Sequence, residues 1–245
     1  MAFDTAGQII ADAMTELGLS AVSDPFTSDD PNATQMCTFL KSLGRDLLGE
    51  HKWTILRKEY SFTTVLNTPT YTLPADFYGM YDQSGWNRTN RLPLGGPLDA
   101  QEWQYLKARL VNVVFTVLFR PMAGSIYIYP DTNTPGGYNI AFEYRSNGWV
   151  RVPALPSDTY QDYPSDAAHI IQYESNLVSR GLKLKWLKAH GFDTVSAQQD
   201  YNDALMKAKG NDSFTPILSL TRPGALRGVD QMIGQQSVPI TGFGT

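Results

Sequence analysis

The chain has 245 residues, which is enough for one large domain or two small ones with a substantial hydrophobic core. Its 20 basic and 24 acidic residues give a net charge of −4, which argues against a general nucleic-acid binder, because such a protein needs a basic face to displace counterions from phosphates. The charge is compatible with a surface past which DNA slides without being held. Only 18% of the residues are charged, which suits a protein that buries surface against partners and equally an ordinary β-rich domain.

Cysteine content and apolar runs indicate the compartment. Cys37 is the only cysteine, so no intramolecular disulfide can form and a reducing compartment is favoured. The first residues, MAFDTAGQII, lack the charged region and apolar core of a signal peptide, so we expect none. The longest apolar run, VNVVFTVLF at 111–119, is far shorter than the roughly 20 residues of a membrane helix and predicts a buried strand.

Two helices are predicted at the start of the chain. The first spans 5–18, where Thr5 and Gln8 have capping-box spacing and Gly18 ends the helix. The second begins at Asp30, a favourable N-cap, followed by Pro31 at the first helical position. Both helices carry an apolar face, made by Ile9, Ile10, Ala13, Met14 and Leu17 in the first and by Met36, Leu40, Leu43 and Leu47 in the second. The second face fits an intramolecular core better than a seam for a partner's helix.

Strands dominate from Trp53 to Val150. Asp99 and Glu102 have N-cap and N3 spacing, so one short helix is expected over 98–110. The connections are too short for parallel crossovers, so the strands should form an antiparallel β domain of six to eight strands. The predicted strand segments are 59–65 with 70–73 as a hairpin, 77–86 with 90–96 as another, 113–119, the two tyrosine-rich strands of a hairpin within 125–144, and 148–150.

The C-terminal part is predicted to return to helices. Residues 151–164 contain several prolines and are interpreted as a linker. A helix from Asp166 to about His190 follows, with Ser165 as cap and Gly191 as terminator, and a last helix spans 194–209 between Asp193 and Gly210. The first of these has an apolar face of Ile170, Tyr173, Leu177, Leu184 and Leu187.

The stretch 211–245 has no periodic apolar face and could not fold alone. It is nevertheless rich in large apolar side chains, so we interpret it as an arm that orders on a partner rather than as an inert tail. The candidate partner-binding residues are Ile217, Leu218, Leu220, Leu226, Met232, Ile233 and Phe243.

These patterns predict an α+β fold. Helices from both ends form a bundle, an antiparallel β domain is inserted between them, and the chain ends in an extended arm. The expected boundaries are 1–52 for the N-terminal helices, 53–150 for the β domain, 151–210 for the linker and C-terminal helices, and 211–245 for the arm.

Signatures of catalysis are absent from the sequence. The three histidines form no H-x-x-x-H pair, and there is no nucleophile elbow, Walker A sequence or G-x-G-x-x-G. Cys37 lies near the apolar face of its helix and is expected to be buried and inert. Asp76, Asp82 and Asp131 could supply a glycosidase's carboxylate pair but fit ordinary turn aspartates better. We therefore expect no enzyme and no catalytic, cofactor or metal site.

Two groups of side chains remain as candidates for binding. The tyrosines of 125–144 could stack on sugars or bases, but packing in a core or an interface is more usual. The cations near the end of the 166–190 helix could face DNA, but a solvated face or acidic partners in a neighbouring subunit is the simpler interpretation. The two groups are Tyr127, Tyr129, Tyr138 and Tyr144, and Arg180, Lys183, Lys185 and Lys188.

Two segments carry a resemblance to a known family. TYTLPADFYGMYDQSGW (70–86) resembles a virion-protein segment in which Leu-Pro-x-Asp-Phe joins two strands, and SIYIYPDTNTPGGYNIAFEYRSNGWV (125–150) resembles its later hairpin. Together with the flanking helices, residues 5–210 resemble the head-to-tail adaptors of short-tailed bacteriophages, which are tail tubular protein A-like or gatekeeper-like. The arm matches no such motif.

The resemblance implies a structural protein of the virion neck or tail, made in the host cytoplasm. Such adaptors form a ring, commonly of twelve copies, that joins the portal protein to the tail nozzle protein and lets double-stranded DNA pass through its centre. Helices would form the ring body, with Arg180, Lys183, Lys185 and Lys188 as candidates for the channel face, while the tyrosine hairpin would be a docking surface and the arm would grip the portal. No cofactor and no membrane would be involved.

Other functions remain open from the sequence alone. The chain could be a different phage tail, baseplate or fibre-attachment component. It could also be a binding module for carbohydrate or single-stranded nucleic acid that uses the tyrosine face. An observed ring of this protein on a portal would distinguish the adaptor function from both of these alternatives.

Overall fold

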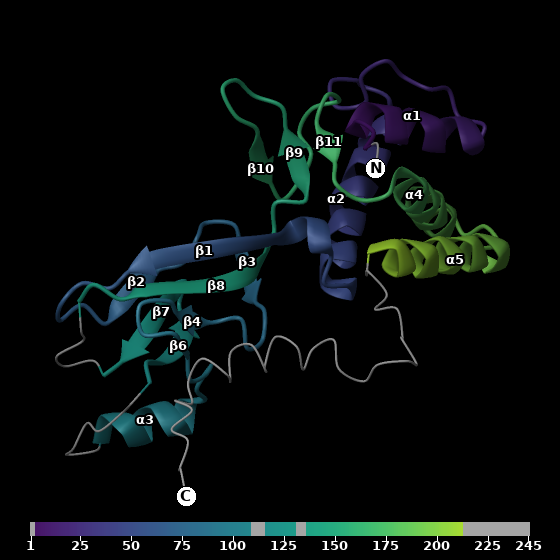
Figure 1. Ribbon diagram of the computed structural model, residues 1–245. Helices are drawn as coiled ribbons and strands as arrows, with labels where there is room; N and C mark the ends of the chain where they lie inside the picture. The colour runs from purple at the N-terminus through teal and green to yellow at the C-terminus, as the bar shows by residue number, and fades with distance from the viewer. Residues whose placement is uncertain (1–2, 109–115, 131–135, 213–245) are drawn as a thin grey trace, which may run out of the picture. The chain divides into compact units, whose positions relative to one another are not determined.

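The computed structural model describes residues 3–108, 116–130 and 136–212. These residues form an α+β fold of five α-helices and antiparallel sheets, as predicted (Figure 1). Residues 113–115 of the predicted strand 113–119 lie outside the described residues, as do all seven apolar arm candidates, Ile217, Leu218, Leu220, Leu226, Met232, Ile233 and Phe243. The chain divides into the compact unit 1–212 and the unit 213–245.

The N-terminal helices begin where their caps predict. Helix α1 (Ala6–Glu16) starts after Thr5, whose hydroxyl accepts from the amide of Gln8 while the Gln8 side chain accepts from the Thr5 amide. Helix α2 (Pro31–Glu50) starts after Asp30, whose carboxylate accepts from the Asn32 amide at 2.9 Å. The capping predictions for both helices are confirmed.

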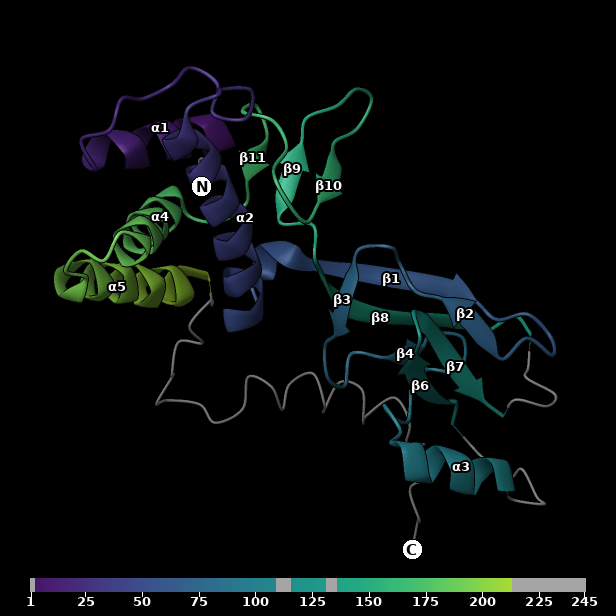
Figure 2. The same ribbon diagram turned by 180° about the vertical axis from the view of Figure 1, so that it is seen from behind.

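Helix α4 (Ser175–Ala189) lies between α1 and α5 (Val195–Asp212) and also packs against α2 (Figures 1 and 2). Gly181 of α4 allows this approach, because a Cβ there would collide with Leu43 of α2. The apolar face predicted for α2 is therefore core: Met36, Leu40, Leu43 and Leu47 are all buried in the helical cluster.

The predicted start of α4 is wrong. Residues 166–174 form turns and the strand β11 (Ile170–Ile171) instead of a first helical turn, and Ser165 does not cap the helix. The reason is long-range hydrogen bonding: Ala6 and Gly7, whose amides lie at the start of α1 and have no partner within that helix, donate to the carbonyls of His169 and Ala167. At the other end, Gly191 adopts a positive φ just after α4, as expected of a terminator.

The predicted linker 151–164 is also structured. Strand β9 (Val150–Val152) pairs with β10 (Thr159–Gln161) on one side and with β11 on the other, so the segment is a hairpin in a small three-stranded sheet. The last helix passes through Gly210 and ends at Asp212, two residues beyond the predicted terminator. A glycine in a helix costs only about 1 kcal/mol, which tertiary contacts readily offset.

Between α2 and β9 the chain forms two further antiparallel sheets, following the short 3₁₀-helix η1 (Thr54–Leu56). The strand count, eight among the described residues, agrees with the prediction. The first sheet contains β1 (Arg57–Thr63), β8 (Asn139–Ser146), β3 (Phe77–Met80), β4 (Trp86–Asn87) and β5 (Leu92–Pro93), and the second contains β2 (Thr70–Thr72), β7 (Ser125–Tyr129) and β6 (Leu118–Met122).

Two predicted hairpins do not form. Strand β1 pairs with β8 rather than with β2, and the tyrosine-rich strands β7 and β8 belong to different sheets (Figure 2). Phe62 of β1 and Tyr71 of β2 stack at 4.4 Å between ring centroids, so the short turn carries the chain from one sheet to the other. Aromatic side chains are buried between the sheets instead, and of the three predicted hairpins only the second is seen, as the short pairing of β4 with β5. Strand β6 forms a hairpin with β7 that the sequence did not predict.

Helix α3 (Ala100–Ala108) has the predicted cap. The Asp99 carboxylate accepts from the Glu102 amide at 2.7 Å, and the Glu102 carboxylate accepts from the Asp99 amide at 3.0 Å. Its buried side chains, Trp103 and Leu106, pack on Tyr129 of β7.

Two glycines of α2 provide a matched test of this packing. A Cβ at Gly44 would overlap the indole of Trp149, whereas Gly49 has nothing within 4 Å. We expect Gly44→Ala to lower the free energy of unfolding by about 1–3 kcal/mol through overpacking. Gly49→Ala should raise it by about 0.5–1 kcal/mol through helix propensity. Urea denaturation followed by circular dichroism measures both, and equal stability of the two variants would contradict the tight Trp149 contact.

Candidate functional site

Groups suited to catalysis or metal binding do not gather in the described part of the chain. No cluster of three or more His, Cys, Asp or Glu side chains suited to a metal ion occurs there. Cys37 is buried, its thiol donates to the Pro25 carbonyl at 3.3 Å, and burial raises the pKa of the thiol to about 11. None of the described helices combines the length and apolar character needed to cross a membrane.

Asp76, the acidic residue of the Leu-Pro-x-Asp-Phe segment, joins strands in the five-stranded sheet. Its carboxylate accepts from Lys58 of β1 at 2.7 Å, and from Tyr144 and Ser146 of β8 at 2.9 and 2.7 Å. Its backbone carbonyl accepts from the amide of Asn147. Because three side chains converge on it, Asp76 ties the start of β3 to its neighbour β8 and, through Lys58, to β1 on the far side of β8.

The electrostatics of Asp76 follow from these partners. Desolvation by burial acts to raise the pKa of the carboxyl, but the hydrogen bonds from Lys58, Ser146 and Tyr144 and the Lys58 charge outweigh it, so the pKa is lowered. Burial and the Asp76 charge raise the pKa of Tyr144 well above its usual range. Of the other candidate carboxylates, Asp82 is 82% exposed beside Lys52, and Asp131 lies outside the described residues. Asp76 is thus a structural carboxylate.

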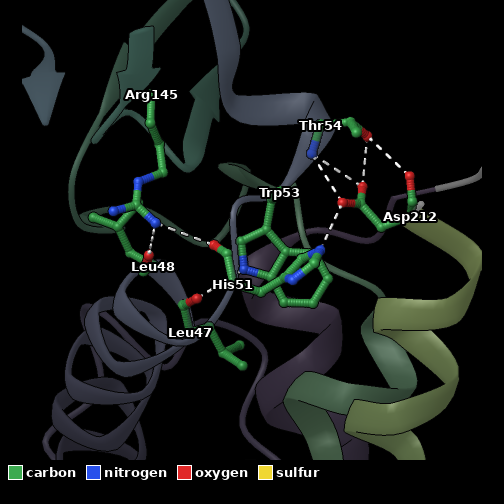
Figure 3. Close-up of polar contacts among 7 residues, drawn as sticks. All are labelled: Leu47, Leu48, His51, Trp53, Thr54, Arg145 and Asp212. Atoms are coloured by element: carbon green, nitrogen blue, oxygen red, sulfur yellow. Dashed lines mark hydrogen bonds and ion pairs between the residues drawn. The ribbon is translucent and has the colours of Figure 1, made fainter. Parts of the chain in front are cut away.

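A second polar cluster lies where α2, η1 and α5 meet (Figure 3). The Asp212 carboxylate accepts from the Thr54 amide at 2.9 Å and from its hydroxyl at 2.6 Å, and lies 3.2 Å from His51 Nε2. An amide at the start of η1 is therefore capped by a carboxylate distant in the sequence. Lys209 and Glu50 form a 2.7 Å ion pair between the same two helices.

Arg145 of β8 approaches this cluster from the sheet (Figure 3). Its guanidinium donates to the carbonyls of Leu48 and His51 at 3.0 and 3.3 Å, which satisfies acceptors at the end of α2 and places a cation at its negative dipole end. The ring of Tyr78 stacks on the same guanidinium at 4.4 Å. The segment 48–54 is thus held by α5 on one side and by β8 on the other.

The predicted interface tyrosines separate into two pairs. Tyr129 and Tyr144 are buried in the chain's own hydrophobic clusters, which removes them from any docking surface. Tyr127 and Tyr138 are partly exposed, and their role in an interface stays a prediction. Tyr127 and Tyr129 lie on the same face of β7 and both contact Trp103 of α3, whereas Tyr144 belongs to β8 in the other sheet and packs in a different cluster.

The predicted channel cations all face polar partners within the chain. Arg180 lies 3.6 Å from Asp200 of α5, Lys183 lies 3.7 Å from Glu16 of α1, and Lys185 lies 2.7 Å from Asp46 of α2. Lys188 donates to the side-chain oxygen of Gln198 at 2.8 Å. Arg180, Lys183 and Lys185 are partly exposed, and Lys188 is exposed near the end of α4. That this face of α4 lines a channel stays a prediction.

The family to which the chain belongs can now be stated. The described residues form a compact α+β unit in which the carboxylates of Asp76 and Asp212 hold strands and helices together. The family model described as SU10 adaptor protein matches residues 4–224, nearly the whole chain. The chain belongs to this family of phage head–tail adaptors and is a structural component of the virion. A comparison with curated proteins gave no match.

Sequence reasoning missed the roles of Asp212, Arg145 and Thr54. Asp212 and Thr54 are 158 positions apart, and no local pattern marks either as a partner. Asp76 did carry a signal, since it belongs to the Leu-Pro-x-Asp-Phe segment on which the family resemblance rests.

The Asp76 cluster predicts acid-sensitive stability. A lowered folded-state pKa contributes stability that is present above about pH 4, the usual unfolded value, and is lost as the pH falls through the folded value. We expect Asp76→Asn to lower the free energy of unfolding at pH 7 by about 1.5–3 kcal/mol and to flatten its fall in acid. Asp82→Asn, at an exposed position, should change neither; denaturation from pH 7 to pH 3 distinguishes them.

The junction around Asp212 gives a further test. Asp212→Ala leaves the Thr54 amide and hydroxyl without their acceptor, so we expect a loss of about 1–2 kcal/mol in unfolding free energy. Asp203→Ala, at an exposed site on the same helix, should be nearly neutral. Thermal denaturation compares the two variants, and an unchanged Asp212→Ala would show that the cluster adds no stability.

Proposed function

We propose that the chain assembles as a ring, of twelve copies by the family resemblance, that joins the portal to the tail nozzle. The observation that carries this proposal is the family match across residues 4–224, which covers the whole described body and the first part of the arm. A ring needs subunits that keep their shape, and the contacts of Asp76, Arg145 and Asp212 hold helices and sheets in one body.

The arm 213–245 would provide attachment to the portal. Its apolar side chains have no use in a solvated tail, and ordering on a partner would offset the entropy cost of fixing them. The root of the arm is well defined, because Asp212 is fixed to Thr54 and His51. The arm would therefore leave each subunit at one place.

Passage of double-stranded DNA requires a channel that does not hold phosphates. The α4 surface with Arg180, Lys183 and Lys185 suits this requirement, because each cation already has an acidic partner in its own chain. Few counterions would be released on contact with DNA, so binding would be weak and only slightly salt-dependent. This supports α4 as part of the channel wall.

Co-expression with the neighbouring portal tests the ring and the arm together. Negative-stain electron microscopy of the wild-type chain should show an added ring under the portal with an open centre. A variant that ends at Asp212 should keep the unfolding transition of the wild type, because the hydrophobic clusters of the body are built from residues before 213, but should leave the portal bare. A bare portal with the wild-type chain would overturn the proposal and favour another tail or baseplate component. Loss of the unfolding transition on truncation would instead make the arm part of the core.

A further inference from the structure

One face of the five-stranded sheet contains a hollow of about 550 Å³. Trp86 of β4 forms one wall and lies directly opposite Ala141 of β8, whose small side chain leaves room beside the indole. Glu59, Glu143, Arg88 and Arg91 surround this apolar centre. Trp86 is 46% exposed, a large amount for an indole on the face of a sheet.

The charges around the hollow indicate what it would accept. Glu59 is paired with Arg88 at 2.8 Å and Glu143 with Arg57 at 3.7 Å, so a charged ligand would have to displace existing ion pairs. The indole N–H of Trp86 and the guanidinium of Arg91, by contrast, have no hydrogen-bond partner among the described residues. The hollow therefore offers an aromatic surface with free donors, which suits an apolar segment that presents carbonyl acceptors.

The loop of the β9–β10 hairpin has the complementary character. Its sequence is Pro153-Ala154-Leu155-Pro156, and the Leu155 side chain is 100% exposed. The prolines fix φ and have no N–H, so the loop presents acceptors and few donors. Asp158 holds the loop in shape, since its carboxylate pairs with Arg151 at 3.2 Å and accepts from the Ala154 amide at 3.4 Å. A preformed loop loses little entropy when it binds.

We propose that the Leu155 loop of one copy inserts into the Trp86 hollow of the next copy in the ring. The fully exposed Leu155 side chain and the half-exposed Trp86 indole would both leave water on contact, and this chain carries both halves of such a pair. Two different patches on one chain make a heterologous, head-to-tail contact, the type that closes rings. The inference rests on the proposed ring and names one of its subunit contacts.

Cross-linking of mixed variants tests the contact directly. Full-length Leu155→Cys and Glu59→Cys proteins are prepared separately, mixed, assembled with the portal and oxidised; the buried Cys37 is retained in both. Glu59 lines the hollow, and the loss of its exposed ion pair should cost little. We expect a disulfide-linked dimer in the mixture and none in either protein alone. A mixture of Leu155→Cys with Asp203→Cys, on the exposed side of α5, should give none.

The possible results of the cross-linking experiment distinguish failure of this contact from failure of the proposed function. Rings on the portal without a cross-link in the mixture would overturn the contact and leave the adaptor function standing. A third mixture combines Glu59→Cys with Pro239→Cys, a substitution in the arm. A cross-link in that mixture, but not with Leu155→Cys, would also overturn the contact and assign the hollow to the arm. Absence of both rings and cross-links would overturn the ring and this contact with it.

A charge at the loop provides the second measurement. Leu155→Asp alters a fully exposed side chain, so its unfolding transition should equal that of the wild type. Loss of an apolar anchor should reduce ring assembly on the portal about tenfold. Met206→Asp, an exposed apolar residue of α5 outside the contact, should assemble normally. Equal assembly of the two variants would contradict the proposal.

Discussion

Trp149 lies against the backbone of α2 at Gly44, where any larger residue would collide with its indole ring. The same ring stacks on Tyr173, whose hydroxyl donates to the Gly44 carbonyl, and Trp53 packs on Tyr173 from the other side. Trp53 lies in the connection from α2 to the five-stranded sheet, and Trp149 lies in the connection from that sheet to β9. This aromatic cluster therefore fixes both connections at once, and the remaining elements are positioned from it.

Polar contacts complete the junction that the aromatic cluster begins. Arg145 neutralises the end of α2 from the sheet, and Asp212 caps η1 from the last helix. Each satisfies backbone groups that a helix end leaves without partners. Asp212, the last residue of α5, is part of this junction.

Surface charge has a consistent arrangement across the described residues. Arg180, Lys183 and Lys185 of α4 are paired with acids on α5, α1 and α2. Glu59 and Glu143 beside Trp86 are paired with Arg88 and Arg57. Such pairs add little stability at exposed sites, but they leave a surface with weak attraction for phosphates. The surface groups left to bind other chains are then mainly apolar and aromatic side chains, as expected of a virion component that functions by assembly.

The sequence by itself determined the elements with local causes: the caps at Thr5, Asp30 and Asp99, the apolar face of α2, and the fold class. It also marked Asp76 through the segment that resembles known adaptors. Tertiary structure alone decided the partners of β1, β7 and β8, the strand in place of the first turn of α4, and the contacts of Arg145 and Asp212. The physical reason is range: caps and helical periodicity act within about four residues, whereas strand pairing and junction contacts join positions that only the packed core brings together.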